Sequence, residues 1–157
     1  MNIQLLAVGE KMPAWVTEGF NEYAKRIRGD CRLTLKEISA GKRAKNADIQ
    51  RIRTEESQRL LAAAPNGSRI VLLDVDHKPW STPELAQQIK SWMASGQHTT
   101  LLIGGPEGLD DICRDRADQV WSLSPLTFPH PLVRIIVAEQ IYRALSILRN
   151  HPYHRAG

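Results

Sequence analysis

The hydrophobic positions of the chain follow two alternating periods from one end to the other. Short apolar runs are typical of buried strands in a parallel sheet, and apolar stripes at a spacing of three or four residues are typical of helices. The runs predict strands at 3–8, 33–38, 69–74, 99–103 and 119–123. This order predicts an α/β fold with a mainly parallel sheet and helices on both faces. Because we find no repeat or linker, we expect residues 1–157 to form a single domain.

Helices are predicted between these strands and after the last one. Pro13 suits the first turn of the first helix. Asn46 is expected to cap the second helix, and Thr82, which is followed by a proline, is expected to cap the third. A short fourth helix is expected at 109–117. The apolar positions expected to face inward in the first two helices are Trp15, Val16, Phe20, Tyr23 and Ile27, followed by Ile49, Ile52, Leu60 and Leu61.

The final helix, predicted at 131–148, is apolar on more than one side. One stripe comprises Leu132, Val133, Ile136, Val137, Ile141, Leu145 and Leu148, and a second side adds Ile135, Tyr142 and Ile147. A helix of this kind must be buried on more than one face. A small domain has few elements to cover both, so we expect a homodimer interface. A central helix within a monomer is the alternative.

Composition and charge narrow the class of protein. The net charge of +4 and the pI of about 9.3 favour an acidic partner such as RNA, although many basic enzymes bind no nucleic acid. Cys31 and Cys113 lie far apart without a metal-ligand spacing, so we expect reduced thiols and no metal. No apolar stretch is long enough for a membrane span, and the start of the chain shows no basic leader region. We therefore expect a cytoplasmic protein.

Two loops near the C-terminal end are candidates for a small-molecule site. The loop 104–108 follows a strand and precedes a helix, where backbone N–H groups face ligands, but it matches neither a dinucleotide fingerprint nor a P-loop. The loop 123–131 holds three prolines, which exclude regular structure. Its Leu123, Leu126 and Phe128 could form an apolar wall for an adenine-like ring. The alternatives are a tight turn and a connector that shields the sheet edge.

The C-terminal tail and two basic clusters are candidates for RNA contacts. His151 and His154 can exchange protons near neutral pH, Tyr153 can stack on a base, and Arg155 can bind phosphate. A frayed terminus is the alternative. The basic clusters could contact phosphates or be solvated faces; they contain Lys42, Arg43 and Lys45, and Lys25, Arg26, Arg28 and Arg32.

Several strings together are specific for one family. They are LLIGGPEG at 101–108, FPHPLVR at 128–134, AEQIYRA at 138–144 and NHPYHR at 150–155, with AVGEKMPAWV and AGKRAKNADI upstream. With these strings, essentially the whole chain resembles the RlmH family of SPOUT-class methyltransferases, which modify a pseudouridine of the large-subunit ribosomal RNA. Pro125 stands where a small residue such as alanine is usual, and Phe128 where leucine is usual, so Pro125 could reshape the second loop.

This resemblance implies an α/β fold with a C-terminal trefoil knot, a homodimer, and S-adenosyl-L-methionine bound in the knot. The substrate implied is a pseudouridine in helix 69 of 23S rRNA (conventional position 1915), methylated at N3 on assembled ribosomes. By position, the cofactor contacts would be Leu73, Gly104, Leu123, Ser124, Pro125, Leu126, Thr127 and Phe128.

Methylation of a pseudouridine nitrogen requires removal of its proton and orientation of its lone pair. We expect His154 to take the proton, Arg155 and Arg143 to stabilise charge, and Tyr153 to stack on the base. In a dimer, the tail of one subunit would complete the pocket of the other. The competing hypotheses are a SPOUT methyltransferase of another RNA, such as tRNA, and a ribosome-binding assembly factor without turnover.

Overall fold

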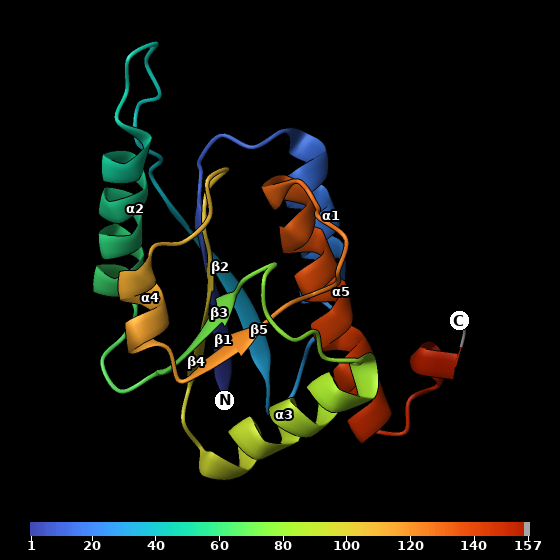
Figure 1. Ribbon diagram of the computed structural model, residues 1–157. Helices are drawn as coiled ribbons and strands as arrows, with labels where there is room; N and C mark the ends of the chain where they lie inside the picture. The colour runs from blue at the N-terminus through green and yellow to red at the C-terminus, as the bar shows by residue number, and fades with distance from the viewer. Residues whose placement is uncertain (156–157) are drawn as a thin grey trace.

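The computed structural model describes residues 1–155, and strands and helices alternate along them (Figure 1). In chain order the elements are β1 (Asn2–Val8), α1 (Ala14–Ala24), β2 (Arg32–Ile38), α2 (Ile49–Ala63), β3 (Arg69–Leu73), α3 (Thr82–Ser95), β4 (Thr99–Ile103), α4 (Asp111–Arg116), β5 (Gln119–Trp121), α5 (His130–Leu148) and the 3-10 helix η1 (Pro152–Arg155). The predicted strands are confirmed, with β5 ending two residues earlier than expected.

The strands form one five-stranded sheet in the order β2-β1-β4-β3-β5, and every neighbouring pair is parallel. β4 lies at its centre, and all five of its residues are buried, including Thr99 and Thr100. β2 lies at an edge, and only Leu33 and Ile38 of its residues are buried. The expectation of a parallel sheet is therefore confirmed, and the carboxyl ends of its strands lie at one edge.

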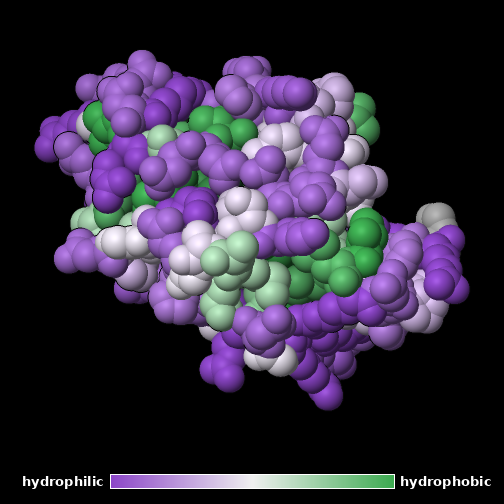
Figure 2. All heavy atoms as spheres, turned by 90° about the horizontal axis from the view of Figure 1, so that it is seen from below, coloured by the Kyte–Doolittle hydropathy of each residue, from purple (hydrophilic) through white to green (hydrophobic). Residues whose placement is uncertain are grey.

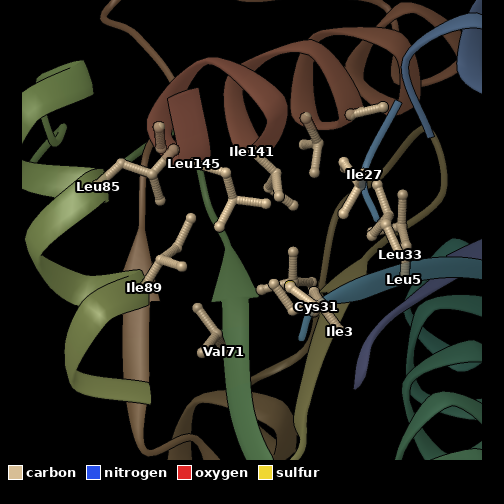
Figure 3. Close-up of a cluster of buried hydrophobic side chains, with 14 of the residues drawn as sticks. Ile3, Leu5, Ile27, Cys31, Leu33, Val71, Leu85, Ile89, Ile141 and Leu145 are labelled. Carbon is tan, nitrogen blue, oxygen red and sulfur yellow. The ribbon is translucent and has the colours of Figure 1, made fainter. Parts of the chain in front are cut away.

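Helices cover both faces of the sheet, as expected. Figure 1 shows α1, α3 and α5 on one side and α2 and α4 on the other. The larger core cluster lies beneath the first group; Figure 3 shows Leu85 and Ile89 of α3 and Ile141 and Leu145 of α5 converging on Val71 of β3. A smaller cluster lies beneath α2 and α4. Burial of these apolar side chains is the main favourable contribution to folding.

The final helix buries one side within the subunit. Val137, Ala138 and Ile141 are fully buried where α5 packs between α1 and α3. Leu132 and Ile136 are only half-buried. Apolar surface also gathers in one area of the face seen in Figure 2, bordered by hydrophilic side chains. The homodimer stays a prediction, as does the knot. No helix among residues 1–155 is long and apolar enough to cross a membrane.

Both predicted caps were wrong by one or two residues. Asp48, not Asn46, caps α2, and its carboxylate accepts a hydrogen bond from the Arg51 amide at 3.2 Å. Ser81, not Thr82, caps α3 in a capping box with Glu84. The Thr82 hydroxyl instead donates to the Gln140 side chain at 2.7 Å, which ties α3 to α5.

Two residues expected to face inward are exposed instead. Trp15 is 54% exposed and Ile49 is 43% exposed. Each lies in the first turn of its helix, before the residues that the helix buries.

Candidate active site

A cavity of about 520 Å³ lies where β3, β4 and β5 end. Most of its lining comes from the segments 73–76, 103–109 and 123–130, which follow these three strands. Arg53, Arg114 and Val133 complete it from α2, α4 and α5. Parallel α/β sheets bind ligands outside the carboxyl ends of their strands, and small-molecule sites span roughly 300–1,000 Å³. Position and size thus indicate a small-molecule site.

The glycine loop closes upon itself at one wall of this cavity. The Gly108 amide donates to the Gly105 carbonyl at 2.9 Å, and Gly108 has a positive φ of 80°. A Cβ atom on Gly104 would lie 2.7 Å from the backbone carbon and oxygen of Gly108. Such a distance is far inside van der Waals contact, so only glycine allows this loop at position 104.

The proline-rich loop forms another wall and is braced by serine hydroxyls. Ser122 donates to the Ser124 carbonyl at 3.2 Å, and the Ser124 hydroxyl accepts from the Leu126 amide at 3.0 Å. Leu126 is 67% exposed although it lines the cavity, so its side chain stands at the mouth. The predicted cofactor residues that line the cavity are Leu73, Gly104, Leu123, Ser124, Leu126, Thr127 and Phe128. Pro125 is exposed and is not among the lining residues.

An ion pair beside the cavity was missed by sequence reasoning. The Arg114 guanidinium donates to the Asp74 carboxylate from Nε at 2.9 Å and pairs with it from Nη2 at 2.7 Å. Hydrogen bonding to Asp74 raises the pKa of Arg114, which remains a cation. The one available signal was an acidic residue directly after a buried strand. Both residues line the cavity, so the pair places both signs of charge at its wall.

His130 begins α5 at the inner end of the second loop. It lines the cavity, and its Nδ1 is buried without a hydrogen-bond partner among the described residues. Burial lowers the pKa of His130, and the nearby cations Arg134 and Arg43 lower it further. Arg134 is itself buried and donates to the Gly9 carbonyl at 2.8 Å while pairing with Glu37 at 2.6 Å. The cavity therefore has a neutral imidazole at one end.

Replacing His130 with glutamine is expected to reduce the loss of stability in acid. Folding lowers the pKa of His130, so below about pH 6.5 the unfolded chain binds a proton at this residue that the folded chain does not. The folded state therefore loses stability as the pH falls through this range. The free energy of unfolding of His130→Gln should fall less steeply between about pH 7.5 and 5.5, by at most about 1.4 kcal/mol per pH unit. Urea unfolding at each pH measures this, with His77→Gln at an exposed position as the control. Parallel curves for His130→Gln and wild type would contradict the assignment.

Of the four residues predicted for catalysis, Arg143 lies in α5 and the other three lie in the C-terminal tail, where Tyr153 and His154 contact α5. The Tyr153 ring packs on Tyr142 at 4.6 Å, its hydroxyl donates to Glu139 at 3.3 Å, and the Arg143 guanidinium lies 4.8 Å from its centroid. His154 lies beside Ser146, and Arg155 is exposed. The tail is therefore docked as a 3-10 helix rather than frayed.

The tail and the cavity of the same chain lie apart. Tyr153 contacts Glu139 and Tyr142, which follow Val133, the last cavity residue of α5, by six and nine positions. At 1.5 Å per residue, this places the tail about 9–14 Å along the helix from the cavity. None of residues 150–155 lines the cavity. The structure thus brings the cofactor candidates together and the catalytic candidates together, but not the two groups within one subunit.

Part of each basic cluster is neutralised internally. Arg26 and Lys25 both pair with Glu22, and the Arg26 guanidinium also lies over the ring of Tyr23 at 5.2 Å. Arg43 pairs with Glu56 and Glu107. The Glu22 pairs are local, whereas those of Arg43 join residues that are distant in sequence and could not be read from local charge density. Among residues 1–155, no group of three or more His, Cys, Asp or Glu side chains is arranged to hold a metal.

The chain is similar to known proteins over its whole length. The model of a family described as "Predicted SPOUT methyltransferase" matches residues 1–154. A protein of Methylococcus capsulatus named Ribosomal RNA large subunit methyltransferase H is 57% identical over 155 residues, which cover 99% of this chain and 100% of that protein. A protein of the same name from Thioalkalivibrio sulfidiphilus is 59% identical over 99% of both chains.

Proposed function

The chain belongs to the SPOUT methyltransferase family, and we propose that it transfers a methyl group from S-adenosyl-L-methionine to large-subunit ribosomal RNA. The observation that carries this proposal is the cavity at the ends of β3, β4 and β5, where the glycine loop packs against its own backbone. The relatives of the chain are named Ribosomal RNA large subunit methyltransferase H. We place the reaction in the cytoplasm, on the assembled ribosome.

The cavity residues fit this cofactor. The apolar side chains of Leu123, Leu126 and Phe128 suit an adenine ring, and the close approach of Gly104 to the Gly108 backbone keeps the loop at this wall compact. Asp74 and Glu107 offer negative charge to a sulfonium or ammonium group, and Arg53 offers positive charge to a carboxylate. When bound, the cofactor supplies a methyl group on a sulfonium whose departure as a thioether drives the transfer.

The nucleotide proposed is the pseudouridine at conventional position 1915 in helix 69 of 23S rRNA. Its N3 lone pair would form the new bond to the methyl carbon as the carbon–sulfur bond breaks, and the N3 proton would pass to His154. The Ser146 hydroxyl donates to the Arg143 carbonyl at 2.6 Å, so its oxygen is left to accept from His154 Nδ1 at 3.4 Å. This contact favours the tautomer with a free Nε2, which is the form that accepts a proton.

The neighbours of His154 would handle charge and base orientation. Arg143 and Arg155 would stabilise negative charge on the deprotonated base, and Tyr153 would stack on it. Because the tail lies apart from the cavity of its own chain, we propose a homodimer in which each tail serves the cavity of the other subunit. The half-buried apolar residues of α5 support such an interface.

Mass mapping of 23S rRNA tests this function. Ribosomes that lack the modification are incubated with the protein and isotope-labelled S-adenosyl-L-methionine, and we expect one labelled methyl group on the helix 69 pseudouridine. A label on tRNA or on another nucleotide would overturn the substrate assignment. A protein that binds ribosomes, transfers no label and shows no rise in melting temperature with millimolar cofactor would instead be an assembly factor.

A further inference from the structure

The Arg43 side chain joins three segments that are distant in sequence. It lies in the loop between β2 and α2 and contacts Glu56 of α2 and Glu107 of the glycine loop. Nη1 and Nη2 donate to the two Glu56 oxygens at 3.0 and 3.1 Å, while Nε donates to Glu107 at 3.0 Å. A single guanidinium thus bridges a helix and the wall of the cavity.

All five N–H groups of Arg43 have partners. In addition to the bonds above, Nη1 donates to the Gly41 carbonyl at 3.0 Å, and Nη2 donates to Glu107 Oε2, the oxygen that also accepts from Nε. A guanidinium has five donors. No donor of Arg43 is left for an RNA phosphate, although the basic sequence around it suggested that role. Within residues 1–155, the side chains of Lys42 and Lys45 of the same loop form no hydrogen bond or ion pair.

Glu56, the partner of Arg43 in α2, is a buried anion. It is 2% exposed, and its carboxylate also accepts from the Gly41 amide at 2.9 Å. A buried charge is costly unless it is paired and hydrogen-bonded. Arg43 therefore cannot leave Glu56 without a large penalty, and this anchors its contact with the glycine loop.

The bridge is in direct contact with the glycine loop. A Cβ atom on Gly105 would lie 3.1 Å from Glu56 Oε1 and 3.2 Å from Arg43 Nη2, so the loop backbone packs on the ion pair. Glu107, two residues after Gly105, lines the cavity. Further along, Asp110 is held by α2 as well, because its amide donates to the Ser57 hydroxyl at 2.9 Å and its carboxylate accepts from Thr54 at 2.6 Å.

We infer that Arg43 is a positioning residue for the cofactor: held by Glu56, it holds the glycine loop through Glu107 in the form that closes the cavity. This inference rests on the proposed function, since it takes the cavity as the S-adenosyl-L-methionine site. It assigns Arg43 to cofactor binding rather than to RNA binding. Loss of Arg43 frees Glu107 and the Gly105 backbone, and the loop then samples open forms that bind the cofactor weakly.

Steady-state kinetics and calorimetry of Arg43→Gln test the inference. The KM and the Kd for S-adenosyl-L-methionine should each rise about tenfold or more, as expected for loss of hydrogen bonds to charged groups, while the KM for ribosomes stays within about twofold. Arg43→Lys, which keeps the charge but not the forked geometry, should recover only part of the affinity. A rise in the ribosome KM with unchanged cofactor affinity would overturn the inference.

Two controls separate positioning from general destabilisation. Leu60→Ala, in the core beneath the same helix, should lower the melting temperature without changing cofactor affinity. Equal loss of cofactor affinity in Leu60→Ala would mean that Arg43 is merely structural. Glu107→Gln leaves the Arg43–Glu56 pair intact, and the double variant Arg43→Gln with Glu107→Gln should lose less affinity than the sum of the single losses. Additive losses would contradict a shared bridge.

A ligand-free measurement keeps this inference distinct from the proposed function. Hydrogen exchange of the amides at 104–110 should speed up in Arg43→Gln and stay unchanged in Leu60→Ala. If wild type binds no S-adenosyl-L-methionine, the proposed function fails, whereas faster exchange still shows that Arg43 holds the loop. Unchanged exchange in Arg43→Gln refutes the bridge even if wild type binds the cofactor.

Discussion

Gly104→Ala is expected to weaken the binding of S-adenosyl-L-methionine and so to lower turnover strongly at micromolar cofactor. The added methyl group would lie 2.7 Å from the backbone of Gly108, which cannot move aside as a flexible side chain could. The loop must therefore open, and overpacking of this kind typically costs about 1–3 kcal/mol, or roughly tenfold to a hundredfold in affinity. Isothermal titration with the cofactor measures the loss directly.

The matched control for this variant is Gly67→Ala. Gly67 has a positive φ, of 79°, so alanine is strained there by the backbone, but nothing lies within 4 Å of its would-be Cβ atom. This variant should lower the melting temperature and leave cofactor affinity unchanged. If Gly104→Ala bound the cofactor as tightly as the wild type does, the glycine loop would not be part of the cofactor-binding site.

Mixing two inactive variants is expected to restore activity. His154→Ala keeps its cavity but lacks the proton acceptor, so its turnover should fall about 10²–10⁴-fold. Gly104→Ala has the damaged cavity but keeps its tail. Because the tail lies about 9–14 Å along α5 from its own cavity, we expect it to serve the other subunit, so a dimer of one variant with the other holds one intact cavity beside one intact tail. Random exchange of equal amounts should return about one quarter of wild-type activity, since half of the dimers are mixed and each holds one working site.

The control for the mixture is Gly104→Ala combined with His154→Ala in one chain. Mixed with His154→Ala, this double variant contributes neither a cavity nor a tail, so no activity should return. Native mass spectrometry of differently tagged chains shows whether mixed dimers have formed. Mixed dimers without recovered activity would show that the tail does not act across the dimer.

The backbone could be predicted from the sequence because parallel strands buried on both faces are continuous apolar runs. The central strand at 99–103 agrees with the prediction at both ends. The caps failed because good capping residues stand close together: Asn46 precedes Asp48 by two positions, and Ser81 directly precedes Thr82. The choice between them depends on tertiary contacts, such as that of Thr82 with Gln140 in α5.

The site was predictable only in part for a related reason. The two loops could be recognised from their glycines and prolines, which restrict local conformation. The bond between Arg43 and Glu107 joins residues 64 positions apart, and that between Arg134 and Glu37 joins residues 97 apart. Local charge density gives no sign of such partners. The substrate and the knot came from the family resemblance, because neither follows from periodicity or composition.

The placement of α5 restricts which insertions and deletions the chain can tolerate. The helix begins with His130 at the cavity and its last turns lead to the tail, so its length sets where the tail emerges. Each added or deleted residue turns the tail by about 100° and moves it by about 1.5 Å. Changes of length should therefore accumulate in exposed turns such as 66–67 and be excluded between 130 and 148.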